Sequence, residues 1–166
     1  HAWVGVTAQA IAIESIGAGP FGPAAVGLVA WDPDRYHSLY HPGDAYSYDI
    51  FSQAGATLRH PTDIDPLGGL QPKIILADGQ SQSAIRMLTY VNAIHPEARA
   101  YDGFLIHNRA GTGASLGDGY ATLVSRVRTD LDVPVFQFIT ETELFELAGA
   151  DLGFTKARQP NSSSVH

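Results

Sequence analysis

The sequence predicts an α/β protein built on a mostly parallel sheet with helices on both faces. Three observations predict this class. Short apolar segments alternate with segments of helical periodicity, the apolar segments look buried on both faces, and Gly and Pro gather between them. The chain has 166 residues, of which 45% are hydrophobic and 16% are charged, as in an ordinary globular domain. We therefore expect residues 1–166 to belong to one domain.

The first half of the chain is expected to hold one strand and one helix. The opening segment HAWVGVTAQAIAI is apolar and has no acidic residue before Glu14, which predicts a buried strand at about residues 2–8. Gly and Pro indicate a loop at residues 17–27. From Ser47 to Leu58, apolar residues recur at steps of three and four and predict a helix, which we expect Pro61 to end.

The second half alternates predicted strands with predicted helices. Segments rich in apolar, β-branched and aromatic side chains mark the strands, at residues 73–77, about 102–107 and 133–139. Helical spacing begins at Ser83 and is expected to stop at Pro96, and it returns in YATLVSRVRTDL, residues 120–131. This order is typical of parallel strands joined by crossover helices.

The charge and composition of the chain exclude some classes of partner. Ten Lys and Arg against 17 Asp and Glu give a formal net charge of −7, and the basic residues form no stripe that would bind nucleic acid. No stretch approaches the ~18 apolar residues of a membrane span, and the N-terminus lacks the order of a signal peptide. With no cysteine there is no disulfide framework and no thiolate chemistry. We expect a soluble protein that binds neither nucleic acid nor a membrane. The sequence does not assign its compartment, and an extracytoplasmic location is one of the options.

One serine stands where an apolar run gives way to a helical pattern. Gly79-Gln80-Ser81-Gln82-Ser83 has the Gly-x-Ser-x-small layout of a nucleophile elbow, a tight strand-to-helix turn that needs small residues on either side of the serine. This layout predicts a strained turn with the Ser81 Oγ exposed, and a Gln82 N–H that can point at a developing oxyanion. The alternative is a plain Gly/Ser turn that caps the following helix.

Several segments together resemble one known family. The segments AWVGVTAQ, HPGDAYSYDIFSQAG, DPLGGL, GQSQSAIRMLTYVNAIHP, YDGFLIHNR, VPVFQFITETEL and ARQP are similar to those of the alpha/beta hydrolase domain family, esterase-like proteins with a Gly-x-Ser-Gln-Ser nucleophile motif. The resemblance spans nearly the whole chain. It implies an alpha/beta-hydrolase-like fold and a serine hydrolase that acts on carboxylic esters through an acyl-enzyme on Ser81, without a metal or an organic cofactor.

The resemblance also implies a carboxylate after the second strand beyond the serine. The segment ITETEL lies at that position and supplies two glutamates. We favour Glu141, which directly follows the predicted strand, as the acid that orients a histidine, with Glu143 as the fallback. The alternative is that both are solvated charges at the start of a helix. Gln80, beside Ser81, and His107, at the end of the neighbouring strand, are candidate substrate contacts.

The resemblance implies more than these 166 residues supply. A triad in this fold runs serine, acid, histidine in chain order, and no histidine after Glu141 stands in a suitable setting, because His166 is the final residue. The family also implies strands before residue 1, a glycine-containing loop with a second oxyanion donor, and a last strand after residue 166. We therefore expect a partial hydrolase domain that is insoluble or molten when expressed alone.

Other residue clusters receive structural interpretations. His37, His41 and Asp44 have the residue types of a metal site, but Pro42-Gly43 breaks any shared helical face, so we expect surface-loop residues and no metal. The glycines of GTGASLGDG, a predicted loop, lack dinucleotide-binding spacing. Two functions remain: the serine hydrolase, and a catalytically inactive fragment or binding scaffold. Expected partners are a small-molecule ester, and the remaining parts of the same protein or a second copy of it.

Overall fold

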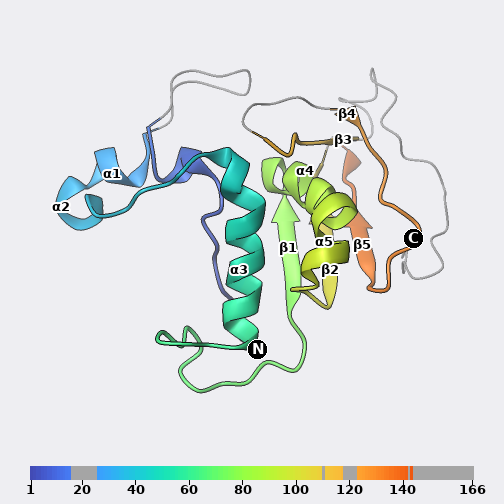
Figure 1. Cartoon of the computed structure of the whole chain (residues 1–166). Coiled ribbons are helices and arrows are strands. Elements are labelled where there is room, and N and C mark those ends of the chain that lie inside the picture. Colours follow the sequence, from blue (N-terminus) through green and yellow to red (C-terminus); the bar gives the residue numbers. More distant parts are fainter. Residues whose placement is uncertain (16–25, 110, 118–122, 142, 144–166) are drawn as a thin grey trace. The chain divides into compact units, whose positions relative to one another are not determined.

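The computed structural model describes residues 1–15, 26–109, 111–117, 123–141 and 143 (Figure 1). The chain forms two compact units, His1–Ala54 and Gly55–His166. The second unit holds the parallel sheet and every candidate site residue. In the part of the chain that is described, no helix has the length and apolar character needed to cross a membrane.

The first unit consists of short helical segments and the beginning of one longer helix. These elements are η1 (Ala10–Ala12), α1 (Leu28–Trp31), α2 (Pro33–Tyr36), η2 (Asp44–Tyr46) and α3 (Ser47–Arg59), which continues into the second unit. α3 confirms the helix predicted from Ser47, and it ends two residues before Pro61, as expected for a residue that cannot continue a helix. The carboxylate of Asp32 caps α2 by accepting a hydrogen bond from the Arg35 N–H at 3.2 Å.

The strand expected at about residues 2–8 is wrong. Residues 1–15 are all described and contain no strand, and the Trp3 side chain is 82% exposed. A strand is held by ladder hydrogen bonds to a neighbouring strand, and an apolar composition by itself provides no such neighbour.

His41 is buried, which corrects the expectation of a surface-loop residue. Its Nδ1 accepts a hydrogen bond from the Gly43 N–H at 3.1 Å, so its Nε2 carries the proton and donates to the Ala8 carbonyl at 3.1 Å. The ring therefore ties the opening segment to the loop before α3. Both ring nitrogens are used in this structural role.

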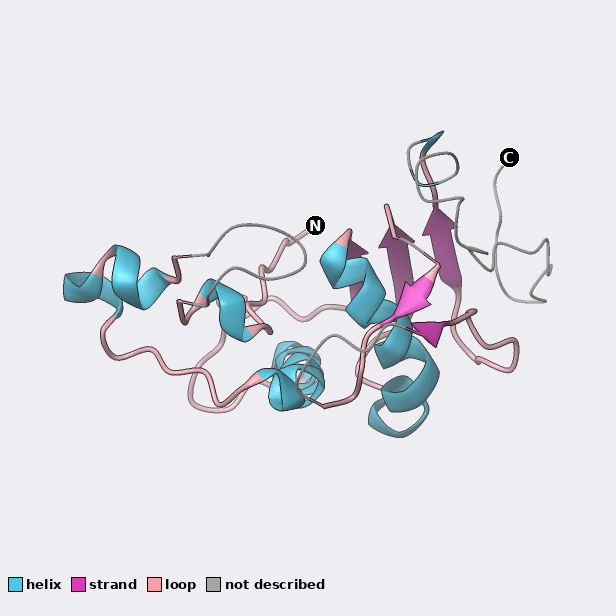
Figure 2. Ribbon diagram, turned by 90° about the horizontal axis from the view of Figure 1, so that it is seen from above, coloured by secondary structure: helices cyan, strands magenta, loops and turns pink. Residues whose placement is uncertain are grey.

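The core of the second unit is a three-stranded parallel sheet in the order β1-β2-β5 (Figures 1 and 2). The strands are β1 (Leu76–Gln80), β2 (Gly103–His107) and β5 (Val135–Phe138). The register sets Gln80 of β1 opposite His107 of β2, and His107 opposite Phe138 of β5. The three strands predicted in the second half of the chain all exist, and their carboxyl ends meet at one edge of the sheet, as parallel strands require.

β1 begins three residues later than the predicted 73–77. The Ile75 N–H donates to the Asp102 carboxylate at 2.7 Å, and the Ile75 carbonyl accepts from the Asp102 N–H at 2.8 Å. Both backbone groups of Ile75 are therefore paired with Asp102 and not with a neighbouring strand. Arg59 pairs with the same carboxylate at 2.9 Å. The hydrogen bond from the Ile75 backbone and the contact with Arg59 outweigh partial burial and lower the pKa of Asp102. The ladder therefore starts at Leu76, and β1 runs directly up to the serine.

Helical segments that follow β1 pack on one face of this sheet (Figure 2). They are α4 (Gln82–Thr89), a π-helical turn labelled η3 (Tyr90–Ile94) and α5 (His95–Ala98). Side chains of α4 and η3 are buried against the strands, among them Ala84, Leu88 and Val91, which are 0% exposed. The rings of Tyr90, Tyr101, Phe104 and His95 form a contiguous aromatic cluster beneath them.

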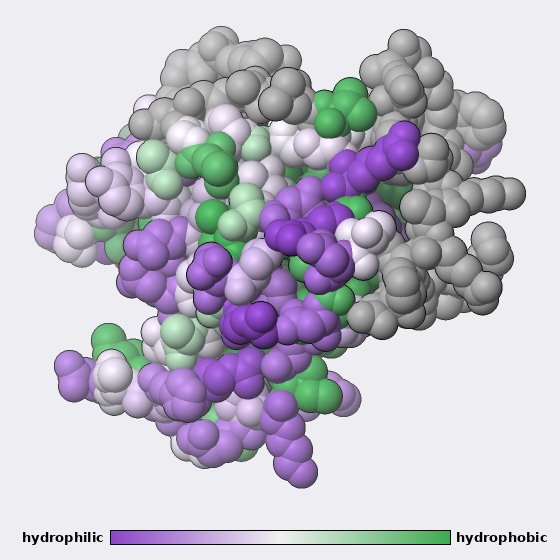
Figure 3. Space-filling model, turned by 45° about the vertical axis from the view of Figure 1, so that its right-hand side comes forward, coloured by the Kyte–Doolittle hydropathy of each residue, from purple (hydrophilic) through white to green (hydrophobic). Residues whose placement is uncertain are grey.

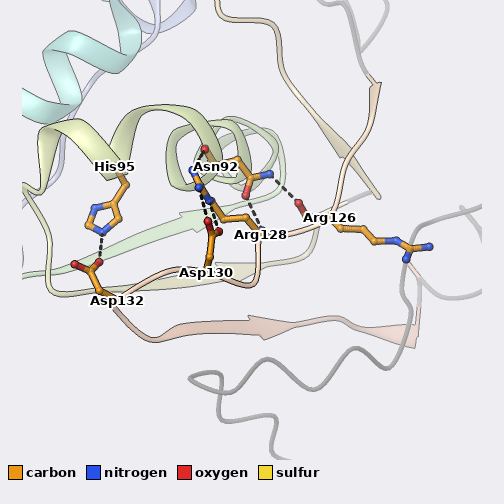
Figure 4. Close-up of polar contacts among 6 residues, drawn as sticks. All are labelled: Asn92, His95, Arg126, Arg128, Asp130 and Asp132. Atoms are coloured by element: carbon orange, nitrogen blue, oxygen red, sulfur yellow. Dashed lines mark hydrogen bonds and ion pairs between the residues drawn. The ribbon is translucent and has the colours of Figure 1, made fainter.

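The expectation that Pro96 stops this helix is wrong. Pro96 stands in the first turn of α5, where its missing N–H removes no hydrogen bond that the new turn needs. The π-helical turn before it widens the backbone, which lets the chain pass the proline ring. His95 at this junction is buried, and burial lowers its pKa despite Asp132 at 3.8 Å (Figure 4).

The helix expected at residues 120–131 is also wrong for residues 123–131, and its first three residues lie outside the described part of the chain. Leu123–Val124 form a short strand, β4, which pairs antiparallel with β3 (Thr112–Gly113) in the stretch expected to be a loop, and residues 125–131 are extended loop. Asn92 explains this outcome (Figure 4). Its side chain donates to the Arg126 carbonyl at 2.8 Å and accepts from the Arg128 N–H at 3.0 Å, so backbone groups that a helix would pair locally are paired with η3.

Candidate functional site

Ser81 occupies a strained turn between β1 and α4. Its backbone angles are φ 53° and ψ −120°, an unfavourable region for a residue with a Cβ, and its side chain makes no capping hydrogen bond to α4. The Ser81 N–H donates to the His107 carbonyl at 3.1 Å, and the Ser81 carbonyl accepts from the Ile85 N–H at 3.1 Å. The residue is exposed. The strained turn predicted from the sequence is therefore confirmed, and the alternative of a plain helix-capping turn is not the geometry observed.

Gly79 shows why the turn needs a small residue before the serine. A Cβ on Gly79 would lie 3.0 Å from the Ser83 carbonyl oxygen and 3.1 Å from the Met87 Cβ, both in α4. Such contacts are closer than ordinary packing allows, and one partner is backbone, which cannot swing aside. The absent side chain thus lets the first turn of α4 pack directly on β1 and places Ser81 at the sheet edge.

We expect Gly79→Ala to lower the free energy of unfolding by about 1–3 kcal/mol, because the added methyl must push α4 away from β1. Chemical denaturation of the full-length protein measures this loss. Gly117→Ala is the matched control, since a Cβ there meets no atom within 4 Å. If the two variants were equally stable, close packing at Gly79 would not be what constrains the turn.

A histidine–aspartate contact lies on the face of β1 opposite α4. Side chains alternate along a strand, so Asp78 and Gln80 point away from α4 while Gly79 points toward it. The Nε2 of His107 lies 3.0 Å from the Asp78 Oδ1, and both side chains are partly buried. The Nδ1 of His107 lies 3.2 Å from the Asn108 Oδ1. Both ring nitrogens of His107 therefore have oxygen partners within the sheet edge.

The two candidate glutamates have different surroundings. Glu141 is exposed, whereas Glu143 is buried at 8% exposure. The Glu143 Oε2 accepts hydrogen bonds from the Thr140 N–H at 2.9 Å and from the Thr140 hydroxyl. The hydroxyl bond from Thr140 is the main cause that lowers the pKa of Glu143, and the Asn108 amide adds to it. Glu143 is thus an ionised, oriented carboxylate that follows the end of β5.

The remaining candidate residues lie where the sequence placed them. Gln80 is the last residue of β1 and is exposed, and Gln82 is the first residue of α4 and half-buried. The backbone N–H of Gln82 lies at the positive end of the α4 dipole, next to Ser81. Substrate contacts by Gln80 and His107, and an oxyanion contact by Gln82, stay predictions.

Apolar side chains around the sheet are partly exposed. Leu76 of β1 and Phe138 of β5 are 68% and 52% exposed, on the same face as His107 by strand alternation. On the face that Figure 3 draws, the coloured apolar residues are scattered among polar ones. The described residues contain no group of three or more His, Cys, Asp or Glu that could hold a metal ion.

Sequence reasoning missed the side chains that connect the strand ends. Asp78 carries a signal in hindsight, because it is a single carboxylate in an otherwise uncharged strand, two residues before the end of β1. Asn108 carries another, since asparagine tolerates the left-handed conformation it adopts, φ 55°. Their partners depend on the register between strands, which the local sequence does not encode.

Comparison with known proteins identifies a family. A family model described as an alpha/beta hydrolase domain matches residues 1–166, the full length of the sequence. No match was found among curated proteins or among solved structures. The parallel sheet and its helices agree with part of the fold that this description names.

Proposed function

Because the chain belongs to the alpha/beta hydrolase domain family, we propose that it is a serine hydrolase that cleaves carboxylic esters through an acyl-enzyme on Ser81. The observation that carries this proposal is the backbone of Ser81, with φ 53° directly between a parallel strand and a helix. Such strain persists only where the surrounding structure holds it in place, and it is typical of reactive positions.

The chemistry follows from the position of the hydroxyl. The Ser81 Oγ attacks the ester carbonyl carbon, its proton passes to a histidine base, and the carbonyl electron pair moves onto oxygen. The Gln82 N–H, at the start of α4, stabilises that oxyanion. Collapse expels the alcohol, which takes the proton back from the base, and water then releases the carboxylic acid and restores Ser81.

The orienting carboxylate is one of two glutamates. The sequence favours Glu141, which comes first after β5 and is exposed. The contacts favour Glu143, because Thr140 fixes its carboxylate and lowers its pKa, and an orienting acid has to be ionised and held still. We propose Glu143 for this role, and Glu141 becomes the comparison residue.

Covalent labelling tests the proposed nucleophile. The full-length protein is incubated with a fluorophosphonate, digested and mapped by mass spectrometry. We expect one adduct, on Ser81, and none on Ser83, because only an activated serine hydroxyl attacks the phosphorus. A cooperatively folded protein that forms no adduct would overturn the proposal and favour the second function, an inactive hydrolase-like scaffold.

A further inference from the structure

Hydrogen bonds connect the carboxyl ends of all three strands in one chain of side chains. The members, here called the edge network, are Asp78, His107, Asn108, Thr140 and Glu143. Asp78 belongs to β1, His107 ends β2 and is followed by Asn108, and Thr140 follows β5. The network therefore joins the strand that carries Ser81 to the buried carboxylate beyond β5.

The chemistry of each group fixes the direction of the hydrogen bonds. The ionised Glu143 can only accept, so the single hydroxyl proton of Thr140 is donated to it. The Thr140 Oγ1 is then free to accept from the Asn108 Nδ2 at 3.3 Å. This orientation turns the Asn108 Oδ1 toward the His107 Nδ1, 3.2 Å away. Reversing the Asn108 amide would break the link to Thr140.

The backbone holds Asn108 where this link requires it. Its N–H donates to the Phe138 carbonyl at 3.1 Å, which ties the residue to β5, and its φ of 55° turns the chain at the end of β2. At the other end, Asp78 and Asn108 each present an accepting oxygen to a nitrogen of the His107 ring, so the network requires an N–H donor on both ring nitrogens. Neither nitrogen is left to bind a substrate, so the ring is better suited to fixing its neighbours.

Resting on the proposed function, we propose that His107, Asn108 and Thr140 are positioning residues that hold the Glu143 carboxylate for ester hydrolysis. They act through Glu143 and not on the ester. Thr140 fixes the carboxylate directly, Asn108 fixes Thr140, and His107 anchors Asn108 to Asp78 in β1. Losing the network leaves the carboxylate in place but misoriented, and misplacement of about 1 Å in a reacting array can cost about 10²-fold in rate.

Thr140→Val tests the central link, because valine keeps the shape of threonine but cannot donate. In the full-length protein we expect kcat for a short-chain p-nitrophenyl ester to fall by about 10–100-fold with little change in KM. Thr140→Ser restores the hydroxyl and is expected to recover most of the lost rate. If serine and valine give the same rate, the hydroxyl does not position Glu143 and the proposal is wrong.

A double-mutant cycle shows whether the effect passes through Glu143. In the Glu143→Gln background, Thr140→Val should cause little further loss, because the carboxylate that it positions is already gone. Independent, multiplicative losses would overturn the proposal. Asn108→Gly can replace Thr140→Val in a second double-mutant cycle with Glu143→Gln. It adds no backbone strain, since glycine adopts a positive φ freely.

His107→Gln separates positioning from substrate contact. A positioning role predicts a lower kcat with an unchanged KM, whereas an increase in KM alone would show that the ring binds substrate and would contradict the proposal. Ser81→Ala distinguishes a failure of the proposed function from a failure of the network proposal. If that variant still hydrolyses the ester, the proposed function itself fails. If it is inactive while the network variants keep full rate, only the network proposal fails.

Discussion

Ser81→Ala is expected to lower kcat/KM of the full-length protein for a carboxylic ester by about 10⁴–10⁶-fold, the range found when the nucleophile of a serine hydrolase is removed. The reason is that no acyl-enzyme can form without the Oγ. Alanine keeps the Cβ, so the strained backbone at φ 53° changes little, and the loss reports chemistry and not folding. Steady-state hydrolysis of a chromogenic ester measures it.

Ser83→Ala is the matched control for this experiment. Ser83 lies two residues further on, in the first turn of α4, and it is exposed, so we expect its replacement to leave the rate nearly unchanged. Comparable losses in the two variants would show that the α4 terminus had been disturbed, and equal retention of activity would remove Ser81 as the nucleophile.

The parallel sheet could be predicted from the sequence because its signals are local. An apolar run overlaps each strand of the parallel sheet, and the helix from Ser47 has apolar residues at helical spacing with a proline just beyond its end. The two elements that were predicted wrongly lie where groups distant in the sequence determine the local structure. Residues 2–8 are apolar but have no strand partner, and the backbone of residues 126–128 is bonded to Asn92, more than thirty residues away.

The candidate site also combines a feature that the local sequence predicts with features that depend on distant parts of the chain. The strained turn at Ser81 follows from five consecutive residues, since Gly79 and the start of α4 force its geometry within one short segment. The choice between Glu141 and Glu143 could not be made from the sequence, because it depends on which way the chain turns after β5. The link from Asp78 to Glu143 depends on the register of three strands, which only the folded sheet fixes.

Glu143→Gln is expected to lower kcat by about 10³–10⁴-fold, while Glu141→Gln stays within a few fold of the unmodified protein. Glutamine preserves the size of the side chain but removes the negative charge that would orient the histidine and stabilise its cation. The two residues have the same side chain and lie two positions apart, and they differ in burial and in the hydrogen bonds from Thr140. Parallel kinetics of the two variants, at saturating ester, make the comparison.

The pH dependence adds a second test of the same assignment. Hydrogen bonds from Thr140 lower the pKa of Glu143, so its carboxylate stays ionised below the usual range of glutamate and its contribution is lost only as the pH falls through that lowered value. Thr140→Val removes the main stabilising bond and is expected to shift that loss of activity to higher pH. If Glu141→Gln is the more damaging substitution, Glu143 is not the acid and the residue favoured by the sequence, Glu141, takes that role.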